Sequence, residues 1–170
     1  MLSGYLVRFV EQHADILTDE LVTDLLSNSK TASYRRLSRD ELRQHCFEIY
    51  HGLGRWLGDT DDPALESRVE ALGRERFHEG VPLSEQVYAV GLMKQHLREK
   101  IRSVGVVYSA LELHNELHLS LLIGRFFDRM LYSLVKGYEM AADEGGHPAK
   151  PPRSSKSLLG ESPVNVEWVP

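Results

Sequence analysis

The chain has 170 residues, of which 42% are hydrophobic and 26% charged, with a formal net charge of −5 and a single cysteine, Cys46. This length and composition suit one globular domain with a real core. The acidic balance disfavours general nucleic-acid binding, and one cysteine excludes an intramolecular disulfide, as in a reducing cytoplasm. Charges interrupt the apolar part of the N-terminus and the most apolar stretch, residues 117–135. We therefore expect a cytoplasmic protein without a signal peptide or membrane insertion.

The first half of the chain predicts three helical segments separated by polar residues. Apolar spacing over residues 4–27 suits one bent helix, or two short helices divided near Thr18. Residues 28–36 are polar and predict a loop. Ser38 followed by Glu41 is a capping box, which predicts the start of a helix that ends at Gly58.

Two further helices are expected between Asp62 and Gly105. Asp62 and Pro63 supply an N-cap and a first-turn proline, and Gly80 is a candidate C-cap. A new helix restarts at Ser84 and should end at Gly105. Its expected inward positions are Val87, Val90, Gly91, Lys94, Leu97 and Ile101.

The longest predicted element runs from Leu111 to about Ala142 without a proline, after a second capping box at Ser109. Its apolar stripe is too wide for one face, so the helix is either central in a bundle or in contact with another subunit. We therefore expect an all-α bundle of about five helices over residues 1–143, followed by a disordered Pro-rich tail over residues 144–170. The expected core residues are Trp56, Phe77, Leu97, Phe126 and Met130.

Histidines raise the question of a metal or haem site. His114 and His118 are four residues apart, a spacing that can chelate a metal on one helix face. The sequence places no third ligand, so we treat the pair as weak metal candidates and assign no metal. Of the eight histidines, none is singled out as a haem ligand, and we expect no cofactor.

Three basic residues, Arg74, Arg76 and Lys94, form the candidate ligand-binding set. Arg76 stands where the stripe calls for an apolar residue, and Lys94 lies near the stripe of its own helix. Buried charges are usually paired, so a salt-bridge network with Glu70, Glu75, Glu79 or Glu85 would explain them. An anion-accepting cleft between the two helices is the sharper alternative.

The segments ALGRERFHEGVPLSE (71–85), YAVGLMKQHLREKIRSVG and FFDRMLYSLVKGYE (126–139) resemble the RsbRD N-terminal domain family. The resemblance covers roughly residues 40–139. It implies a helical, globin-related bundle that senses a signal or regulates a protein partner in bacterial signal transduction, and no catalytic residue carries over. Such domains commonly precede an output domain, whereas here only the Pro-rich tail follows.

These observations predict a non-enzymatic bacterial regulatory module that binds a partner signalling protein or a small effector, as a homodimer. The speculative dimer interface is Leu117, Phe127 and Leu131, because the long helix carries more apolar residues than one stripe can hold. A haem- or metal-binding sensor of globin-like architecture is the alternative. An enzyme is disfavoured, because no Ser/His/Asp grouping or Gly-rich phosphate loop is present.

Overall fold

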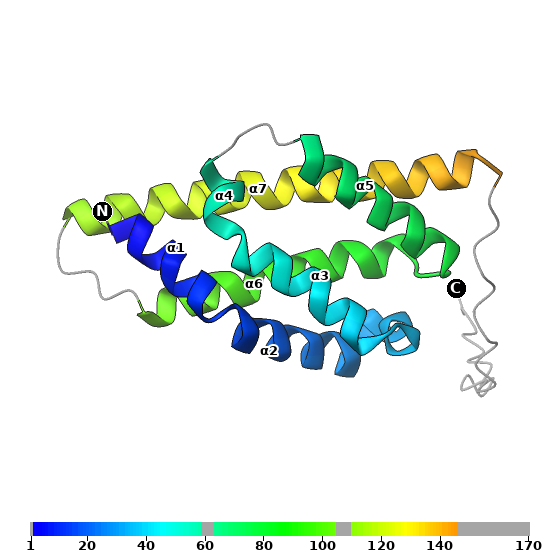
Figure 1. Ribbon diagram of the computed structural model, residues 1–170, viewed down its shortest axis with the longest axis horizontal. Coiled ribbons are helices and arrows are strands. Elements are labelled where there is room, and N and C mark those ends of the chain that lie inside the picture. Colours follow the sequence, from blue (N-terminus) through cyan, green and yellow to red (C-terminus); the bar gives the residue numbers. More distant parts are fainter. Residues whose placement is uncertain (1, 59–62, 105–109, 146–170) are drawn as a thin grey trace, which may run out of the picture.

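The computed structural model describes residues 2–58, 63–104 and 110–145, which fold into helices (Figure 1). In chain order these are α1 (Leu2–Gln12), α2 (Ala14–Ser27), the 3-10 helix η1 (Ser29–Arg36), α3 (Arg39–His51), α4 (Leu53–Gly58), α5 (Pro63–His78), α6 (Leu83–Val104) and α7 (Ala110–Asp143). The described residues contain no strand, so the predicted all-α class is confirmed. The predicted tail from residue 146 onward, the Asp62 cap and the Ser109 capping box lie outside the described residues.

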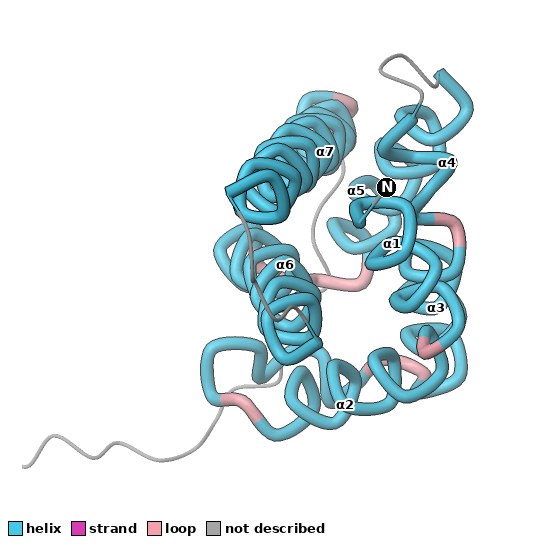
Figure 2. Tube along the Cα trace, turned by 90° about the vertical axis from the view of Figure 1, so that its left-hand side faces the viewer, coloured by secondary structure: helices cyan, strands magenta, loops and turns pink. Residues whose placement is uncertain are grey.

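The helices form two groups around a shared core. Viewed end-on, α6 and α7 lie side by side, and α1, α3 and α4 form the opposite wall (Figure 2). The α2 helix closes one edge by packing on both α3 and α6. The longest helix, α7, extends along the whole bundle, and α5 packs closely against its C-terminal half (Figure 1).

The chain breaks into more helices than the expected five, because two predicted helices are kinked. The first division falls at His13 and not near Thr18, which lies buried inside α2. At His13 the ring Nδ1–H donates to the Phe9 carbonyl oxygen at 2.8 Å, and the backbone leaves helical geometry. The second division falls at Gly52, where the indole of Trp56 lies so close that a side chain on residue 52 would clash with it. The predicted loop at residues 28–36 is the 3-10 helix η1.

Local sequence signals explain two of the helix ends. The Ser38 hydroxyl accepts a hydrogen bond from the Glu41 amide, so the predicted cap of α3 is confirmed. After α5, Gly80 has a φ of 72°, which favours glycine. The Val81 amide donates to the Arg76 carbonyl oxygen at 2.9 Å, and the Gly80 amide donates to that of Phe77 at 3.0 Å. These are the two bonds of a Schellman motif, so the predicted stop at Gly80 is confirmed.

All five expected core residues are buried. Four of them belong to one contiguous cluster, whereas Phe77 packs edge-on against the Tyr138 ring beside it. The predicted inner face of α6 is only partly right. Leu97 and Ile101 are buried, but Val87 and Gly91 are exposed, and Gln86, Ala89, Leu92 and Met93 take the inward positions.

Helices α5 and α7 meet backbone to backbone at a pair of glycines. A Cβ atom on Gly73 would lie under 3.0 Å from the Leu134 carbonyl oxygen, and one on Gly137 would lie equally close to the Glu70 carbonyl oxygen. Real Cβ atoms essentially never come this close to another atom. The contact is reciprocal, because each glycine receives the main chain of the other helix. Any larger residue at either position must push the two helices apart.

We predict that Gly73→Ala lowers the free energy of unfolding by about 1–3 kcal/mol, because overpacking displaces rigid backbone. The matched control is Gly91→Ala, which lies mid-helix on the exposed side of α6 with nothing within 4 Å. It should raise the stability by about 0.5–1 kcal/mol through helix propensity. Urea unfolding followed by circular dichroism measures both effects. Equal stabilities of the two variants would contradict a close glycine contact.

Candidate functional site

The turn between α5 and α6 is held by side chains from several parts of the chain. The Ser33 amide and hydroxyl donate to the Glu85 carboxylate at 2.8 and 3.1 Å. The Arg36 guanidinium donates to the Gly80 carbonyl oxygen at 3.3 Å, and the Gln86 amide nitrogen donates to that of Val81 at 3.2 Å. The 3-10 helix η1 therefore docks onto this turn, where it holds the C-terminal end of α5 and the N-terminal end of α6 in place.

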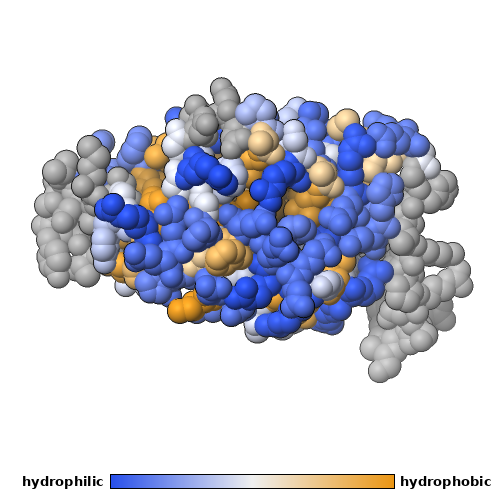
Figure 3. Space-filling view, viewed as in Figure 1, coloured by the Kyte–Doolittle hydropathy of each residue, from blue (hydrophilic) through white to orange (hydrophobic). Residues whose placement is uncertain are grey.

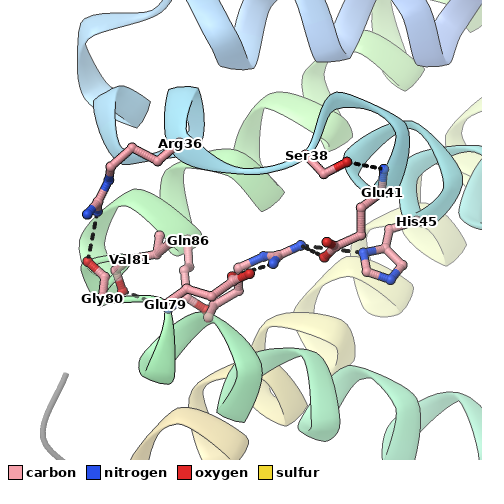
Figure 4. A network of polar contacts seen from close by, with 9 residues as sticks. Arg36, Ser38, Glu41, His45, Glu79, Gly80, Val81 and Gln86 are labelled. Carbon is pink, nitrogen blue, oxygen red and sulfur yellow. Dashed lines mark hydrogen bonds and ion pairs between the residues drawn. The ribbon is translucent and has the colours of Figure 1, made fainter. Parts of the chain in front are cut away.

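Arg76 is the charged centre of this region. Its side chain is 3% exposed. Its guanidinium donates to Glu79, which directly follows α5, and to Glu41 on α3, the latter at 3.1 Å. Figure 4 shows Glu41 and His45 on α3 facing Glu79 at the end of α5. The two carboxylates hold the pKa of Arg76 above its ordinary value, although burial acts in the opposite direction and is the largest single influence. Arg76 is therefore a charged, buried link between α3 and α5.

The other two basic candidates do not join Arg76. Arg74 pairs with Glu144 at 2.8 Å, and Lys94 pairs with Asp128 on α7 at 3.5 Å. Each of the three cations thus faces a different acidic group. The structure favours separate ion pairs over a single anion-accepting cleft built from all three. Of the acidic partners considered from the sequence, Glu79 is the one that binds Arg76, and Glu41 was not expected as a partner of Arg76.

A pocket of about 150 Å³ lies between α3 and α5, with α6 and α7 beneath it. Two ion pairs cross its rim, Arg76 with Glu41 and Arg68 with Glu48. Apolar surface shows between the polar side chains where α3 and α5 face each other (Figure 3). The lining is largely apolar, and it includes Cys46, Met93 and Met130. Gln86 also lines this pocket, and its buried Oε1 has no hydrogen-bond donor among the described residues.

Cys46 is a buried thiol in the wall of this pocket. Burial raises the pKa of Cys46 to about 12, and the positive charge of Arg76 offsets only part of that increase. The thiolate is the reactive form of cysteine, so this thiol is inert at neutral pH. Cys46 is therefore a structural residue of the pocket wall.

The histidine pair proposed as a weak metal candidate lies on the surface. His114 and His118 are both exposed on α7. Among the described residues, the acidic group Glu41, Glu75 and Glu79 brings three carboxylates within 4.8 Å of one another. Two of these carboxylates already bind Arg76, which supplies the positive charge there.

The exposed apolar residues of α7 differ from those expected for a dimer interface. Phe127 is 1% exposed and lies in the core of its own chain, and Leu131 is half-buried. Leu117 is 57% exposed, as expected for an interface. Leu113 and Leu121 are exposed as well, at 49% and 63%. They stand four residues before and after Leu117, so the three leucines form one stripe along the first half of α7, hereafter the leucine stripe.

One family model matches this chain, described as the RsbT co-antagonist protein rsbRD N-terminal domain, over residues 15–147. The chain belongs to this family. The match covers most of the described helices, including Arg76, the α5–α6 turn and α7. No curated protein and no solved structure matches the chain significantly. The family domain is a regulatory signalling domain, which confirms the resemblance drawn from the sequence.

None of the helices within the described residues is both long and apolar enough to cross a membrane. This includes α7, whose apolar stretch is interrupted by Arg125, Asp128 and Arg129.

We predict an asymmetry between the two sides of the Arg76 network. The double variant Glu41→Gln, Glu79→Gln leaves a guanidinium buried without its compensating charges, and it should lose about 3–5 kcal/mol of stability. Arg76→Met leaves two carboxylates that are 36% and 30% exposed and can stay hydrated, so it should lose at most about 2 kcal/mol. Urea unfolding at pH 7 compares them. A larger loss for Arg76→Met would contradict this account.

We also predict that stability falls at alkaline pH through Cys46. Its folded pKa is raised to about 12 from 9.0, so the stabilisation is complete below pH 9 and is lost as pH rises towards 12. At pH 10.5 the thiol should account for a loss of about 2 kcal/mol. Buried Tyr50, whose pKa is also raised by burial, adds to the total loss. Cys46→Ala isolates the thiol: its unfolding free energy should decline less steeply between pH 8 and pH 10.5 than that of the native chain. Identical slopes would contradict the prediction.

Proposed function

We propose that the chain is a non-enzymatic regulatory module that works as a homodimer through the leucine stripe of α7 and acts on a partner signalling protein in the bacterial cytoplasm. The family match supports a regulatory role, because it covers every described helix except α1 and the first residue of α2. Regulation without chemistry requires a change in binding or in helix packing. The leucine stripe is the observation that favours self-association.

Three features of the stripe favour a second copy of the chain as its occupant. Leu113, Leu117 and Leu121 repeat every four residues, so an identical helix offers a complementary row of leucines. The stripe continues into a groove against α6, whose lining includes Ile101 and Leu119. A two-fold axis near Leu117 would bury both stripes against each other in an isologous contact. Two long helices paired in this way could pass a packing change from one chain to the other.

Light scattering at micromolar concentration tests the dimer. We predict twice the mass of one chain for the native protein, and a single-chain mass for the double variant Leu117→Glu, Leu121→Glu, because four buried charges would face one another. The matched control is Ile16→Glu. Ile16 is also apolar and exposed, but it lies on α2 and not on the leucine stripe, so this variant should keep the dimer mass. Circular dichroism confirms that each variant is folded. A native chain of single mass would refute the dimer, and loss of the dimer in Ile16→Glu would place the interface elsewhere.

A haem- or metal-binding sensor is the second candidate, and it has weaker support. His45 is the one histidine among the described residues that lines the pocket between α3 and α5. Its Nδ1 lies 3.5 Å from the Arg76 guanidinium, a positive charge that disfavours a cation beside it. The absorption spectrum and metal content of the purified protein distinguish the two candidates.

A further inference from the structure

The pocket between α3 and α5 has the size and chemistry of a ligand site. Its volume of about 150 Å³ is comparable to engineered protein cavities that take up benzene. Residues from α3, α5, α6 and α7 line it, so an occupant would contact four helices at once. The two facing helices α3 and α5 are joined across the rim by ion pairs of long side chains, which can move apart more easily than packed backbone.

Gln86 contributes an unpaired hydrogen-bond acceptor to the lining of this apolar pocket. The residue is 1% exposed, and its amide nitrogen already donates to the Val81 carbonyl oxygen. That bond fixes the orientation of the amide and leaves Oε1 as a buried acceptor for which the described part of the chain offers no donor. Buried polar atoms are nearly always paired with protein, water or ligand. A ligand that carries an N–H or O–H group would satisfy Oε1.

The charges at the rim select against ions. Arg76 is already shared by two carboxylates, and Arg68 is paired with Glu48, so no cation at the rim is free for an anion. Inside the pocket, an ion of either sign would lose its hydration among apolar side chains. The site therefore suits an uncharged molecule.

We propose that this pocket binds a small neutral ring compound with a hydroxyl or N–H donor, of the size of phenol, whose donor bonds to Gln86 Oε1. The ligand would be the effector of the regulatory module, a role that rests on the proposed function, whereas the binding itself does not. Met130 and Leu134 place the occupant against α7, the helix that carries the leucine stripe.

Calorimetric titration of the full chain with phenol, toluene and benzoate tests the site. Toluene has the shape of phenol but no donor, and benzoate adds a negative charge. We expect phenol to bind saturably with one molecule per chain, toluene at least tenfold more weakly, and benzoate not at all. Failure of every probe to bind would overturn the proposal and leave the pocket to water. Equal binding of phenol and toluene would overturn the role of Gln86.

Two variants locate the binding. Ala89→Leu fills the pocket and should abolish phenol binding, whereas its control Val87→Leu, on the exposed side of the same helix, should leave it unchanged. Gln86→Leu removes the acceptor and should reduce the preference for phenol over toluene to less than twofold. If Ala89→Leu does not fold, Gln86→Leu and the three probes still decide the outcome. Unchanged phenol binding in Gln86→Leu would refute the site. Light scattering of the same samples reports the dimer independently, so loss of the dimer and loss of phenol binding are distinguishable.

Discussion

The close contact between α5 and α7 is the constraint on which the rest of the bundle depends. Gly73 and Gly137 let the two backbones touch, and this contact fixes the height and direction of α5 along the long helix. Packed interiors transmit strain because they have little room to yield. Since α5 cannot approach α3 equally closely, the space between α3 and α5 is spanned by side chains, and there the pocket and the Arg76 network occur.

Arg76 connects α3 and α5, the two helices that the glycine contact between α5 and α7 leaves apart. It is fixed on α5 just before the Schellman turn at Gly80, so the same few residues end the helix and place the guanidinium. Its partner Glu41 follows the Ser38 cap of α3, where the start of the helix is also fixed. A buried ion pair adds little net stability, but it is costly to break on one side only. The network therefore specifies how α3 and α5 face each other more than it stabilises the fold.

The sequence predicted those features whose cause is local. The side-chain cap at Ser38 and the left-handed glycine at Gly80 act within one helical turn, and both lie where expected. The kink at Gly52 was missed, and the division of the first segment was expected near Thr18 and not at His13, because helical periodicity continues through both positions. Arg76 was recognisable as a charge on an apolar stripe, but Glu41 is 35 residues away, and no spacing rule connects them. Gln86 gave no signal at all, since its importance comes from an unpaired atom inside the folded chain.

The long helix α7 marks the limit of pattern analysis, because it is apolar on more than one side. Leu117 and Phe127 are indistinguishable by hydrophobicity, yet one is exposed and the other is buried in the core. Near residue 127 helices α5 and α6 cover α7 on both flanks, whereas the leucine stripe lies beyond the reach of α5, which packs on the C-terminal half. Burial along α7 is thus set by which of its faces the neighbouring helices cover: Leu119 is buried in the same half as the leucine stripe, and Tyr132 is exposed in the half on which α5 packs. In the proposed dimer, a shift of α5 against α7 at the glycine contact would act on one half of a long helix whose other half carries the leucine stripe, so the two halves could be coupled through α7 without direct contact.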